Sequence, residues 1–477
     1  MSNRRDFFKN SAIALAGMAL LPKASLLGAN NTSMYISKRP SIDKRKFSSE
    51  EVEKVITEAK SRIKDPKLAW MFENCFPNTL DTTVEYNLIN GQPDTFVITG
   101  DIHAMWLRDS TAQVWPYLPL AKKDKQLRSL IAGVVFRQTK CVLIDPYANA
   151  FNKSIEEKSH WESDNTEMKK GVHERKWEID SLAYTVRLAY YYWKTTGDTS
   201  VFNKDWEKAA RIILKTFIEQ QRKNGVGPYV FARKTDRQLD TLSNEGYGRP
   251  LKPIGLINSS FRPSDDASTY GFLIPSNLFA VESLKQLAEI SSTVKGDVQF
   301  SGQCMELAKE INHAIQKYGI VKHPKYGQVY AFEVDGYGNH TFMDDANVPS
   351  LLSMPYLGLI GPKDNVYKNT RELIWSDSNP YFFKGKFGEG IGGPHIGYDM
   401  IWPMSIIMKA MTSTSDTEIR WCIKTLRDSD ADTGFMHETF HKDNPQKFTR
   451  SWFAWANTLF GELVLKLINE NKEHLLV

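Results

Sequence analysis

The repeating unit of this sequence is clearest in one stretch, Phe261-Arg262-Pro263-Ser264-Asp265-Asp266-Ala267-Ser268-Thr269-Tyr270. A loop with acidic and aromatic residues is followed there by an apolar helix pattern, in which Leu278, Val281 and Leu284 recur at helical spacing. The same order of loop and helix occurs six times along the chain. The other five loops contain Trp106-Leu107-Arg108-Asp109, Trp177-Glu178-Ile179-Asp180, Met343-Asp344-Asp345-Ala346-Asn347, Gly397-Tyr398-Asp399 and Trp452-Phe453-Ala454-Trp455-Ala456-Asn457.

The spacing of these loops predicts the architecture. Each interval between them is long enough for two helices and their connections. Six helix pairs with polar residues at equivalent ends favour a toroid, in which the loops gather at one face. We therefore predict an all-α fold, an (α/α)6 barrel, as a single domain with short β pieces at 95–99, 328–334 and 229–232. The alternative is an unrelated helical fold whose acidic residues only cap helices.

The N-terminus has the features of a targeting segment. Residues 1–29 carry Arg4-Arg5 and then an apolar run from Ser11 to Leu21, which is too short to span a bilayer. This pattern resembles a twin-arginine export signal, so we expect a periplasmic or secreted mature protein. Residues 30–48 are predicted to form a polar, poorly ordered leader. Residues 49–477 are predicted to form the (α/α)6 domain, with a helix that begins after Ser49.

Composition argues against several classes of partner. Part of the net charge of +5 lies in the targeting segment, so the rest gives no electrostatic reason to expect nucleic acid. No later stretch is apolar and long enough to span a membrane. The four cysteines are far apart, which indicates buried free thiols and not a zinc site. The aromatic content of 12% indicates a large core, a cleft with sugar-stacking rings, or both.

Two groups of carboxylates are candidates for the hydrolysis of a glycosidic bond. That reaction needs one carboxyl group as proton donor and a second to activate water or attack carbon. Asp265 and Asp266 repel each other when both are ionised, which raises the pKa of at least one of the two. Asp266 lies closer to the following helix, whose dipole favours an ionised group, and this makes Asp265 the better donor. The second candidate is Glu438, in the segment Gly434-Phe435-Met436-His437-Glu438-Thr439-Phe440-His441.

The same segment also matches the His-Glu-x-x-His pattern of zinc hydrolases, at residues 437–441. A zinc site of that kind needs the pentad inside a helix, whereas Gly434 precedes it and Asn444-Pro445 follow it closely. We therefore predict no metal and no cofactor. A zinc hydrolase stays an alternative that loss of activity with a chelator would reveal.

At these residues the chain resembles glycoside hydrolase family 125, the metal-independent exo-α-1,6-mannosidases. The likeness extends from about residue 54 to the C-terminus. It rests on Trp106-Leu107-Arg108-Asp109-Ser110, Arg262-Pro263-Ser264-Asp265-Asp266, Met436-His437-Glu438 and Trp452-Phe453-Ala454-Trp455-Ala456-Asn457. The resemblance implies an (α/α)6 catalytic domain that releases terminal mannose from the non-reducing end of α-1,6-linked mannosides, with inversion of configuration.

The resemblance also implies roles for individual residues. One aspartate of the pair Asp265/Asp266 is the general acid, and Glu438 is the general base. In an inverting site two such carboxyl groups stand roughly 6.5–9.5 Å apart. The implied substrate-binding residues are Trp106, Arg108, Asp109, Arg262, Tyr270, His395, Asp399, His437 and Trp452.

Other functions remain open at this point. A different (α/α)6 enzyme, such as a glucosidase, would share the two-carboxylate chemistry. A uronate lyase would need a Tyr or His base and more basic residues than this acid-rich set. A non-catalytic glycan-binding protein would need no reacting pair. All of these predict a glycan ligand, and the oligomeric state is left open.

Overall fold

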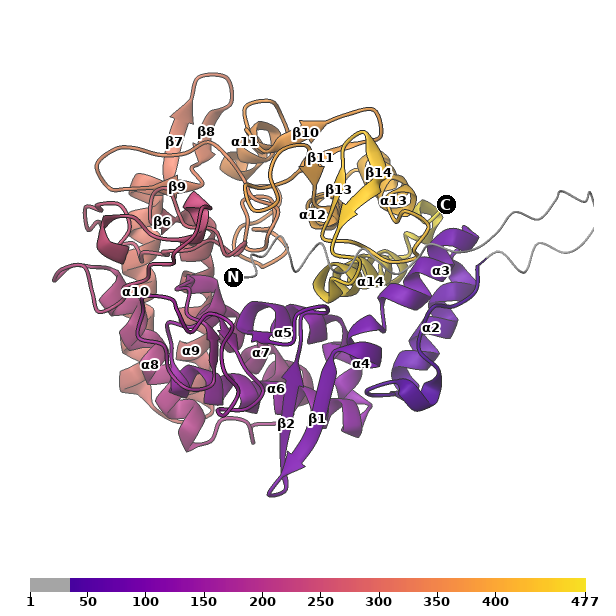
Figure 1. The fold of residues 1–477 in the computed structure, drawn as a ribbon, viewed down its shortest axis with the longest axis horizontal. Coiled ribbons are helices and arrows are strands. Elements are labelled where there is room, and N and C mark those ends of the chain that lie inside the picture. The colour runs from indigo at the N-terminus through magenta and orange to yellow at the C-terminus, as the bar shows by residue number, and fades with distance from the viewer. Residues whose placement is uncertain (1–34) are drawn as a thin grey trace, which may run out of the picture. The chain divides into compact units, whose positions relative to one another are not determined.

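Five helices and one run of turns follow the six acid-bearing loops and line the centre of a ring (Figure 1). The helices are α5 (Leu107–Val114), α7 (Ile179–Thr196), α9 (Ile274–Thr293), α12 (Pro403–Met411) and α14 (Ala454–Asn469). α5 contacts both α7 and α14, α7 contacts α9, and α12 contacts α14. After the fourth acid-bearing loop, residues 348–359 form turns instead of the predicted helix. Arg187 of α7 donates a hydrogen bond of 3.1 Å to Leu357 O in this run, which ties it to the ring.

A second set of helices packs outside the first. These are α2 (Glu50–Arg62), α3 (Pro66–Cys75), α6 (Lys125–Ile144), α8 (Lys204–Gln220), α10 (Val298–Ala314), α11 (Asn365–Ile374) and α13 (Asp416–Asp428). α9 packs against α10, α12 against α13, and α14 against α3. Together the two sets make the predicted (α/α)6 barrel.

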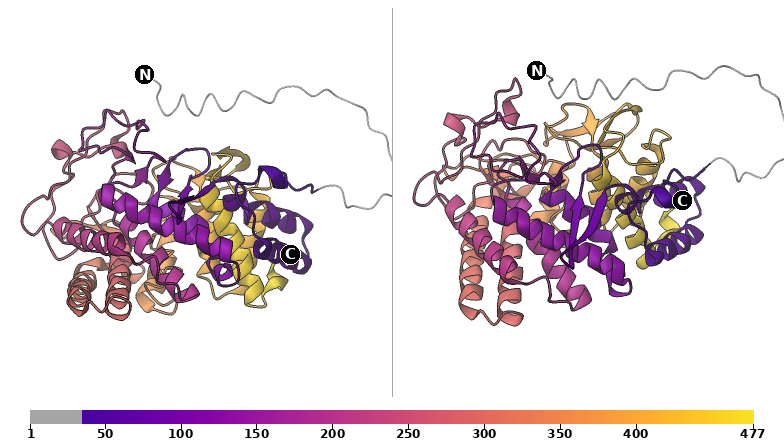
Figure 2. Two further views of the ribbon diagram at one scale, coloured as in Figure 1. Left: turned by 90° about the horizontal axis from the view of Figure 1, so that it is seen from below. Right: turned by 60° about the horizontal axis from the view of Figure 1, so that its bottom comes forward.

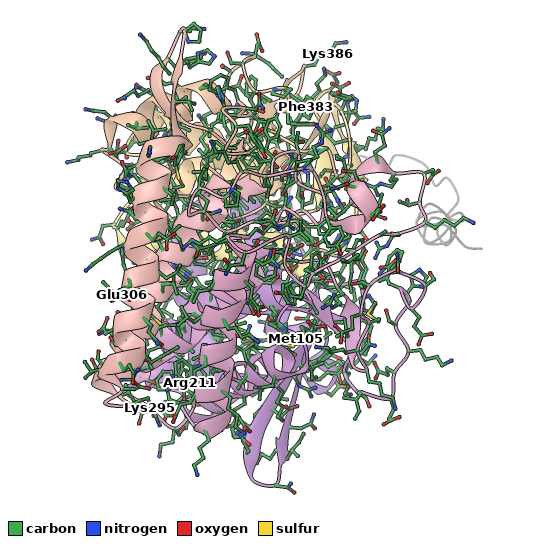
Figure 3. All side chains as sticks on the ribbon, turned by 90° about the vertical axis from the view of Figure 1, so that its left-hand side faces the viewer. Met105, Arg211, Lys295, Glu306, Phe383 and Lys386 are labelled. Atoms are coloured by element: carbon green, nitrogen blue, oxygen red, sulfur yellow. The ribbon has the colours of Figure 1, made fainter. Side chains whose placement is uncertain are left out.

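Burial separates the two sets of helices. α12 is buried at every position from Pro403 to Met411, and most of α14 is also buried, because apolar residues predominate in both. α8 and α10 bury one face and expose charged side chains on the other. Figure 3 shows Arg211, Lys295 and Glu306 on that outer side, and all three are exposed. The core therefore lies between the two sets of helices.

The remaining elements are short. They are the helices α4 (Asn78–Thr82), η1 (Ile42–Lys44), η2 (Trp115–Lys122), η3 (Gln238–Asp240), η4 (Asn244–Gly246), η5 (Ile315–Gly319) and η6 (Glu473–Leu475). The strands are β1 (Val84–Ile89), β2 (Gln92–Val97), β3 (Met105–Trp106), β4 (Ala150–Phe151), β5 (Val172–Glu174), β6 (Phe272–Leu273), β7 (Ile320–His323), β8 (Gly327–Tyr330), β9 (Glu333–Val334), β10 (Phe382–Lys384), β11 (Glu389–Ile391), β12 (Met400–Ile401), β13 (Thr439–His441) and β14 (Asn444–Thr449).

The strands pair antiparallel in small separate sheets, such as β3-β4-β5 and β12-β13-β14. The predicted strands at 95–99 and 328–334 appear as β2 and as β8 with β9. Residues 229–232 form no strand and make only a bridge from Ala232 to Asn165. Figure 2 shows the loops and small strands gathered at one end of the helices. This is the end that carries the acidic residues.

The computed structural model describes residues 35–477, of which 37–477 form one compact unit. The predicted targeting segment lies outside the described residues. Ser49 caps α2 and accepts a hydrogen bond from Val52 N, as predicted. Within the predicted leader, the side chain of Arg39 is buried and pairs with Glu53 (2.6 Å) and Asp81 (2.7 Å). Two carboxylates on the folded unit thus hold this segment in place.

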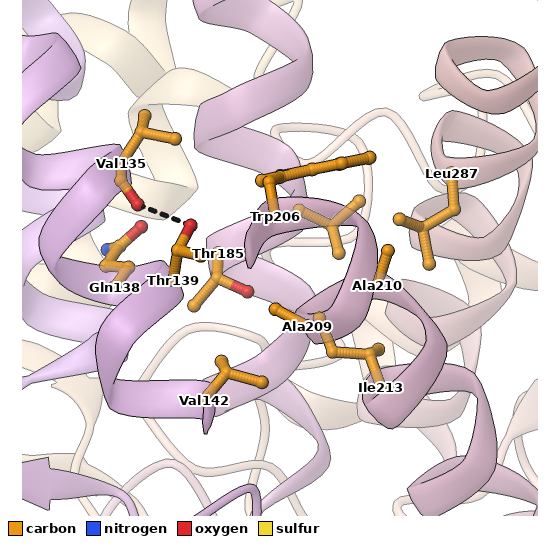
Figure 4. A pocket seen from close by; sticks show the side chains of 11 residues that line it. Val135, Gln138, Thr139, Val142, Thr185, Trp206, Ala209, Ala210, Ile213 and Leu287 are labelled. Carbon is orange, nitrogen blue, oxygen red and sulfur yellow. Dashed lines mark hydrogen bonds between the residues drawn. The ribbon is translucent and has the colours of Figure 1, made fainter. Parts of the chain in front are cut away.

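Two further findings concern the described residues. None of their helices has the length and apolar character needed to cross a membrane. All four cysteines are buried and free, as predicted. A small cavity lies between α6, α7, α8 and α9, and Figure 4 shows its lining, which includes Val135, Trp206 and Leu287. No residue of that lining carries an ionisable side chain, so the cavity is a packing defect and no candidate for chemistry.

Candidate active site

Arg108 lies where three of the acid-bearing loops meet. Its buried guanidinium donates from Nη1 to Glu178 (2.6 Å) and Asp180 (3.2 Å), which flank the start of α7. Nη2 donates to Asp265 Oδ1 at 3.3 Å, and Nε lies 3.5 Å from Asp109 Oδ2. One cation therefore faces four carboxyl groups.

The loop that carries the aspartate pair is a tight hairpin. Phe261 and Ala267 bridge across its base, and Asp265 has a φ of +65°, in the left-handed region. The Asp265 carboxyl reaches the Arg108 cluster, where it also accepts a hydrogen bond of 3.2 Å from Asn149 Nδ2. Asp266 is buried on another side of the loop. The hairpin thus gives two neighbouring carboxyl groups different surroundings.

The helix-dipole argument for this pair is wrong. α9 begins only at Ile274, with Leu273 in the N-cap position and no side chain that caps it. Asp265 and Asp266 lie in the loop, well before Ile274 in the sequence. The dipole acts only within about the first turn of a helix, so it does not reach them. Neither aspartate caps α9, so capping does not explain the pair either.

Asp266 has few polar contacts. Its Oδ1 lies 3.3 Å from His395 Nδ1, and its Oδ2 has no hydrogen-bond partner among residues 35–477. Arg262 and Asp345 lie near enough to interact electrostatically. A buried carboxyl oxygen without a partner costs about 1–3 kcal/mol. Such an atom is suited to bind a ligand hydroxyl.

Burial controls the protonation of the acid cluster. It raises the pKa of Asp180 to about 6 and the pKa of Glu178 well above its usual value, although Arg108 opposes both shifts. Burial acts on Asp265 in the same direction, but the charges of Arg108 and Lys176 outweigh it and hold its pKa below the ordinary range. Asn149 Nδ2 lies 3.4 Å from Glu178 Oε1 and 3.2 Å from Asp265 Oδ1, so the two carboxyl groups are neighbours, and neighbouring carboxyl groups favour a proton on one of them.

Glu438 is held by the hairpin of β13 and β14. Its N–H donates to Thr449 O at 3.2 Å, and Thr449 Oγ1 donates to Glu438 Oε2 at 2.9 Å. Oε1 lies 3.5 Å from Arg450 Nη1. Arg450 also pairs with Asp101 and interacts electrostatically with Asp109. Through Arg450 and Asp109, the surroundings of Glu438 connect to the Arg108 cluster.

The pentad at residues 437–441 is not helical, because Thr439–His441 is strand β13. His437 is buried and stacks on Phe448, with ring centroids 3.7 Å apart, and its Nε2 lies 3.2 Å from Asp430 O. Burial lowers the pKa of His437, so it is neutral at pH 7. The described part of the chain contains no group of three metal-ligating side chains. The helix that the zinc pattern requires is not formed in this segment.

Three indoles with buried N–H groups lie at the same end of the ring. Trp106 precedes α5, Trp402 precedes α12, and Trp452 lies just before α14. In residues 35–477, their Nε1 atoms have no hydrogen-bond partner. Buried indole N–H groups normally find an acceptor. Sugar hydroxyls are acceptors of the right kind, and indole faces also pack against the C–H faces of sugars.

Most of the chain is similar to known proteins. A family model described as metal-independent alpha-mannosidase (GH125) matches residues 65–465. The chain belongs to this family. It is a glycoside hydrolase, as the motifs predict, and the family's metal independence agrees with the absence of a zinc-type helix around Glu438.

Individual relatives support the assignment to this mannosidase family. The Meiotically up-regulated gene 157 protein of Schizosaccharomyces pombe is 44% identical over 456 residues, which cover 92% of this chain and 89% of the relative. A metal-independent alpha mannosidase of Streptococcus pneumoniae, solved in a non-productive complex with α-1,6-mannobiose, is 45% identical with a TM-score of 0.85. That match covers 89% of this chain and 99% of the other. A bacterial glucoamylase complexed with acarbose shares the fold at 14% identity and a TM-score of 0.53, covering 88% and 58% of the two chains.

The other predicted substrate-binding residues do not all lie at the Arg108 cluster. Arg262 is buried and pairs with Glu333 (2.7 Å), whose other oxygen accepts from the backbone N–H of Tyr270 (3.1 Å). Both contacts brace the aspartate hairpin. Asp399 has a side chain that is 44% exposed and pairs with Lys442 (2.7 Å), away from the Arg108 cluster. His395 lies beside Asp266, with its Nδ1 3.3 Å from Asp266 Oδ1.

Several residues of the cluster were not predicted as site residues. Glu178 and Asp180 stand in one of the six loops, but nothing in the sequence separates them from helix caps. Asn149 and Lys176 lie in connecting segments without a motif, and both contact Asp265. Arg450, directly after β14, was not predicted either. A search for charged residues next to the aromatic residue of each acid-bearing loop would have found Glu178 and Lys176, which flank Trp177.

Proposed function

We propose that this mannosidase is an inverting, exo-acting enzyme that releases terminal mannose from the non-reducing end of α-1,6-linked mannosides. The observation that carries the proposal is the arrangement of two separately held carboxyl sites, Asp265 with Asp266 and Glu438, at one end of the barrel. The likeness to the Streptococcus pneumoniae protein, which was solved with α-1,6-mannobiose, supports the choice of linkage.

Glu438 is proposed as the general base. Thr449 donates to one of its oxygens and Arg450 lies beside the other, and both contacts hold the carboxyl group in one orientation. An ionised carboxylate can take a proton from water as that water attacks the anomeric carbon. Attack on the face opposite to the leaving group inverts the configuration.

Asp265 is proposed as the general acid. Its side chain is 13% exposed, whereas that of Asp266 is 3% exposed, so Asp265 has the better access to a glycosidic oxygen. Asp265 also shares the amide group of Asn149 with Glu178, a carboxyl group whose pKa is raised by burial. The free oxygen of Asp266 would then bind a mannose hydroxyl.

The remaining groups are proposed to hold the mannose ring. Arg108 and Asp109 offer donors and acceptors side by side, which suits neighbouring hydroxyl groups. The indole N–H groups of Trp106, Trp402 and Trp452 supply further donors. Glycan binding by such a set needs no metal and no cofactor.

The product anomer tests this function. We expect hydrolysis of α-1,6-mannobiose, much slower hydrolysis of the α-1,2 and α-1,3 isomers, and no change in rate with a chelator. Because inversion turns an α-linkage into a β-product, NMR during the first minutes should show β-mannose first. α-Mannose as the first product would show a retaining mechanism, and equal rates on all three linkages would contradict the α-1,6 preference.

Export of the enzyme is proposed from residues 1–29 alone. The paired Arg4-Arg5 and the apolar run behind them are typical of a twin-arginine signal. We expect the full-length chain to appear in the periplasm of a bacterial host, and R4K/R5K to retain it in the cytoplasm. Fractionation followed by activity measurement checks this, and equal export of both forms would contradict it.

A further inference from the structure

The charges around Arg108 do not balance. Asp109, Glu178, Asp180 and Asp265 all lie within 3.5 Å of this one guanidinium. Desolvation and mutual repulsion among these four carboxyl groups favour protonation, and Arg108, with the added effect of Arg450 on Asp109, opposes it. The cluster therefore retains protons at neutral pH.

The next cation does not change this balance. Lys176 Nζ donates to Asp265 O at 2.8 Å and to Asp240 at 2.7 Å, and it lies 3.6 Å from Glu174. Its charge is already shared between the two carboxylates of Asp240 and Glu174. Within the group around Arg108, the remaining effect of Lys176 falls on Asp265, whose pKa it helps to lower.

Glu178 is the member of the cluster that shares a hydrogen-bond partner with Asp265. Its side chain is fully buried directly before α7. Oε2 accepts from Arg108 at 2.6 Å and from Ser181 Oγ at 3.1 Å, and Oε1 lies 3.4 Å from Asn149 Nδ2. The same Asn149 group donates to Asp265, so one amide holds the two carboxyl groups together. Contact between them requires a shared proton.

We propose that Glu178 stores the proton that Asp265 delivers to the glycosidic oxygen. This inference rests on the proposed role of Asp265 as general acid. Between turnovers the proton lies on Glu178 and is hydrogen-bonded to an ionised Asp265. In the reactive state it has moved to Asp265, whose carboxyl group faces the substrate.

The proton balance of the step closes without a further reagent. The O–H bond on Asp265 breaks as the O–H bond of the leaving sugar forms, and the glycosidic C–O electron pair goes to the leaving oxygen. Glu438 takes one proton from the attacking water. Afterwards Glu438 releases that proton to solvent, and the Glu178–Asp265 pair takes one up.

The electrostatics of the two groups agree with this division of roles. Burial raises the pKa of Glu178 far enough that Arg108 does not bring it back to the ordinary range. On Asp265, Arg108 and Lys176 outweigh burial and lower the pKa. An acid with such a low pKa would be ionised at neutral pH and useless as a donor without a partner that holds the proton. Glu178 is therefore a positioning residue that acts through Asp265.

The test compares Glu178→Gln with Asp180→Asn on two substrates. α-1,6-Mannobiose needs protonation of its leaving group, whereas 2,4-dinitrophenyl α-mannoside does not. Because general acid catalysis contributes about 10²–10⁴-fold, we expect E178Q to lower kcat on mannobiose by about 10²-fold and to leave the aryl substrate within a few-fold. The alkaline limb of kcat/KM should move to lower pH by about one unit, since Gln cannot hold the proton.

Asp180→Asn is the matched control, because Asp180 contacts the same Arg108 nitrogen without a hydrogen bond to Asp265. It should change both substrates by similar factors and leave the alkaline limb in place. Equal losses on both substrates in E178Q would mean that Glu178 only positions Arg108, and the proposal would be wrong. If E178Q does not fold, Glu178→Asp keeps an acid at the site and should retain the alkaline limb; a lost limb in E178D overturns the proposal as well.

Asp265→Asn separates this inference from the proposed function. It should lower mannobiose hydrolysis at least as much as E178Q and spare the aryl substrate. If D265N shows no dependence on the leaving group, Asp265 is not the acid and the fault lies in the proposed function. If D265N behaves as expected and E178Q does not, the fault lies in the role of Glu178 alone.

Discussion

Replacing Glu438 by Gln is expected to reduce kcat on α-1,6-mannobiose by about 10³-fold, within the range of general base catalysis. Gln has nearly the same shape and can still accept a hydrogen bond from Thr449, but it cannot take a proton from water. The 2,4-dinitrophenyl substrate should lose activity to the same extent, because every substrate needs the activated water. Steady-state kinetics on both substrates measures this.

A matched variant separates chemistry from orientation. Thr449→Val removes the hydroxyl that orients Glu438 and keeps the carboxylate, so it should cost far less than E438Q. Thermal melts should show E438Q to be folded. If E438Q hydrolyses mannobiose near the original rate, the base is another residue.

Replacing Arg108 by Met is expected to have the largest effect on stability. The change leaves Asp109, Glu178, Asp180 and Asp265 buried without their shared cation. Removal of one partner from a buried ion pair costs about 3–5 kcal/mol, and activity should be lost with it. Denaturant titration at pH 7 measures the change in the free energy of unfolding.

The control for this variant is Arg211→Met on α8. Arg211 is exposed and pairs with Asp297 at the surface, where an ion pair contributes about 0–1 kcal/mol. A loss in R108M no greater than in R211M would contradict the account of the acid cluster.

The stability deficit of R108M should depend on pH. Burial raises the pKa of Asp109 and of Asp180 to about 6 in the folded enzyme, above the value near 4 of an unfolded chain. Groups with a raised pKa stabilise the fold fully below pH 4, and this stabilisation is lost as pH rises through about 6. Without Arg108 these pKa values rise further, so the loss extends to higher pH. The gap between wild type and R108M should therefore be larger at pH 8 than at pH 5.

Sequence patterns predicted the helical architecture well. The order of acid loop and apolar helix depends on local periodicity, which the residues around Leu278 and Ile407 display directly. The same reasoning placed a helix at the fourth position, where the chain forms turns at 348–359. Periodicity could not show this, because the buried turns there are held by tertiary contacts such as Arg187 to Leu357.

The candidate site was predicted in part. Motif resemblance identified Arg108, Asp265 and Glu438, which the structure holds in buried, hydrogen-bonded positions. It also named Asp399, which pairs with Lys442 in a partly exposed position. The choice between Asp265 and Asp266 rested on a helix start that proved to be too far away. The length of the loop between the aspartate pair and α9 could not be predicted from the sequence alone.

The sequence by itself determined the fold class, the family and the two candidate carboxylate sites, Asp265/Asp266 and Glu438, because these depend on local patterns and on motifs. Only the tertiary structure decided which acids share a cation and which share a proton. Glu178 and Asp265 are far apart in the chain, and their contact exists only because separate loops of the ring meet at Arg108. Protonation depends on burial and on neighbouring charge, and both arise only when the ring closes.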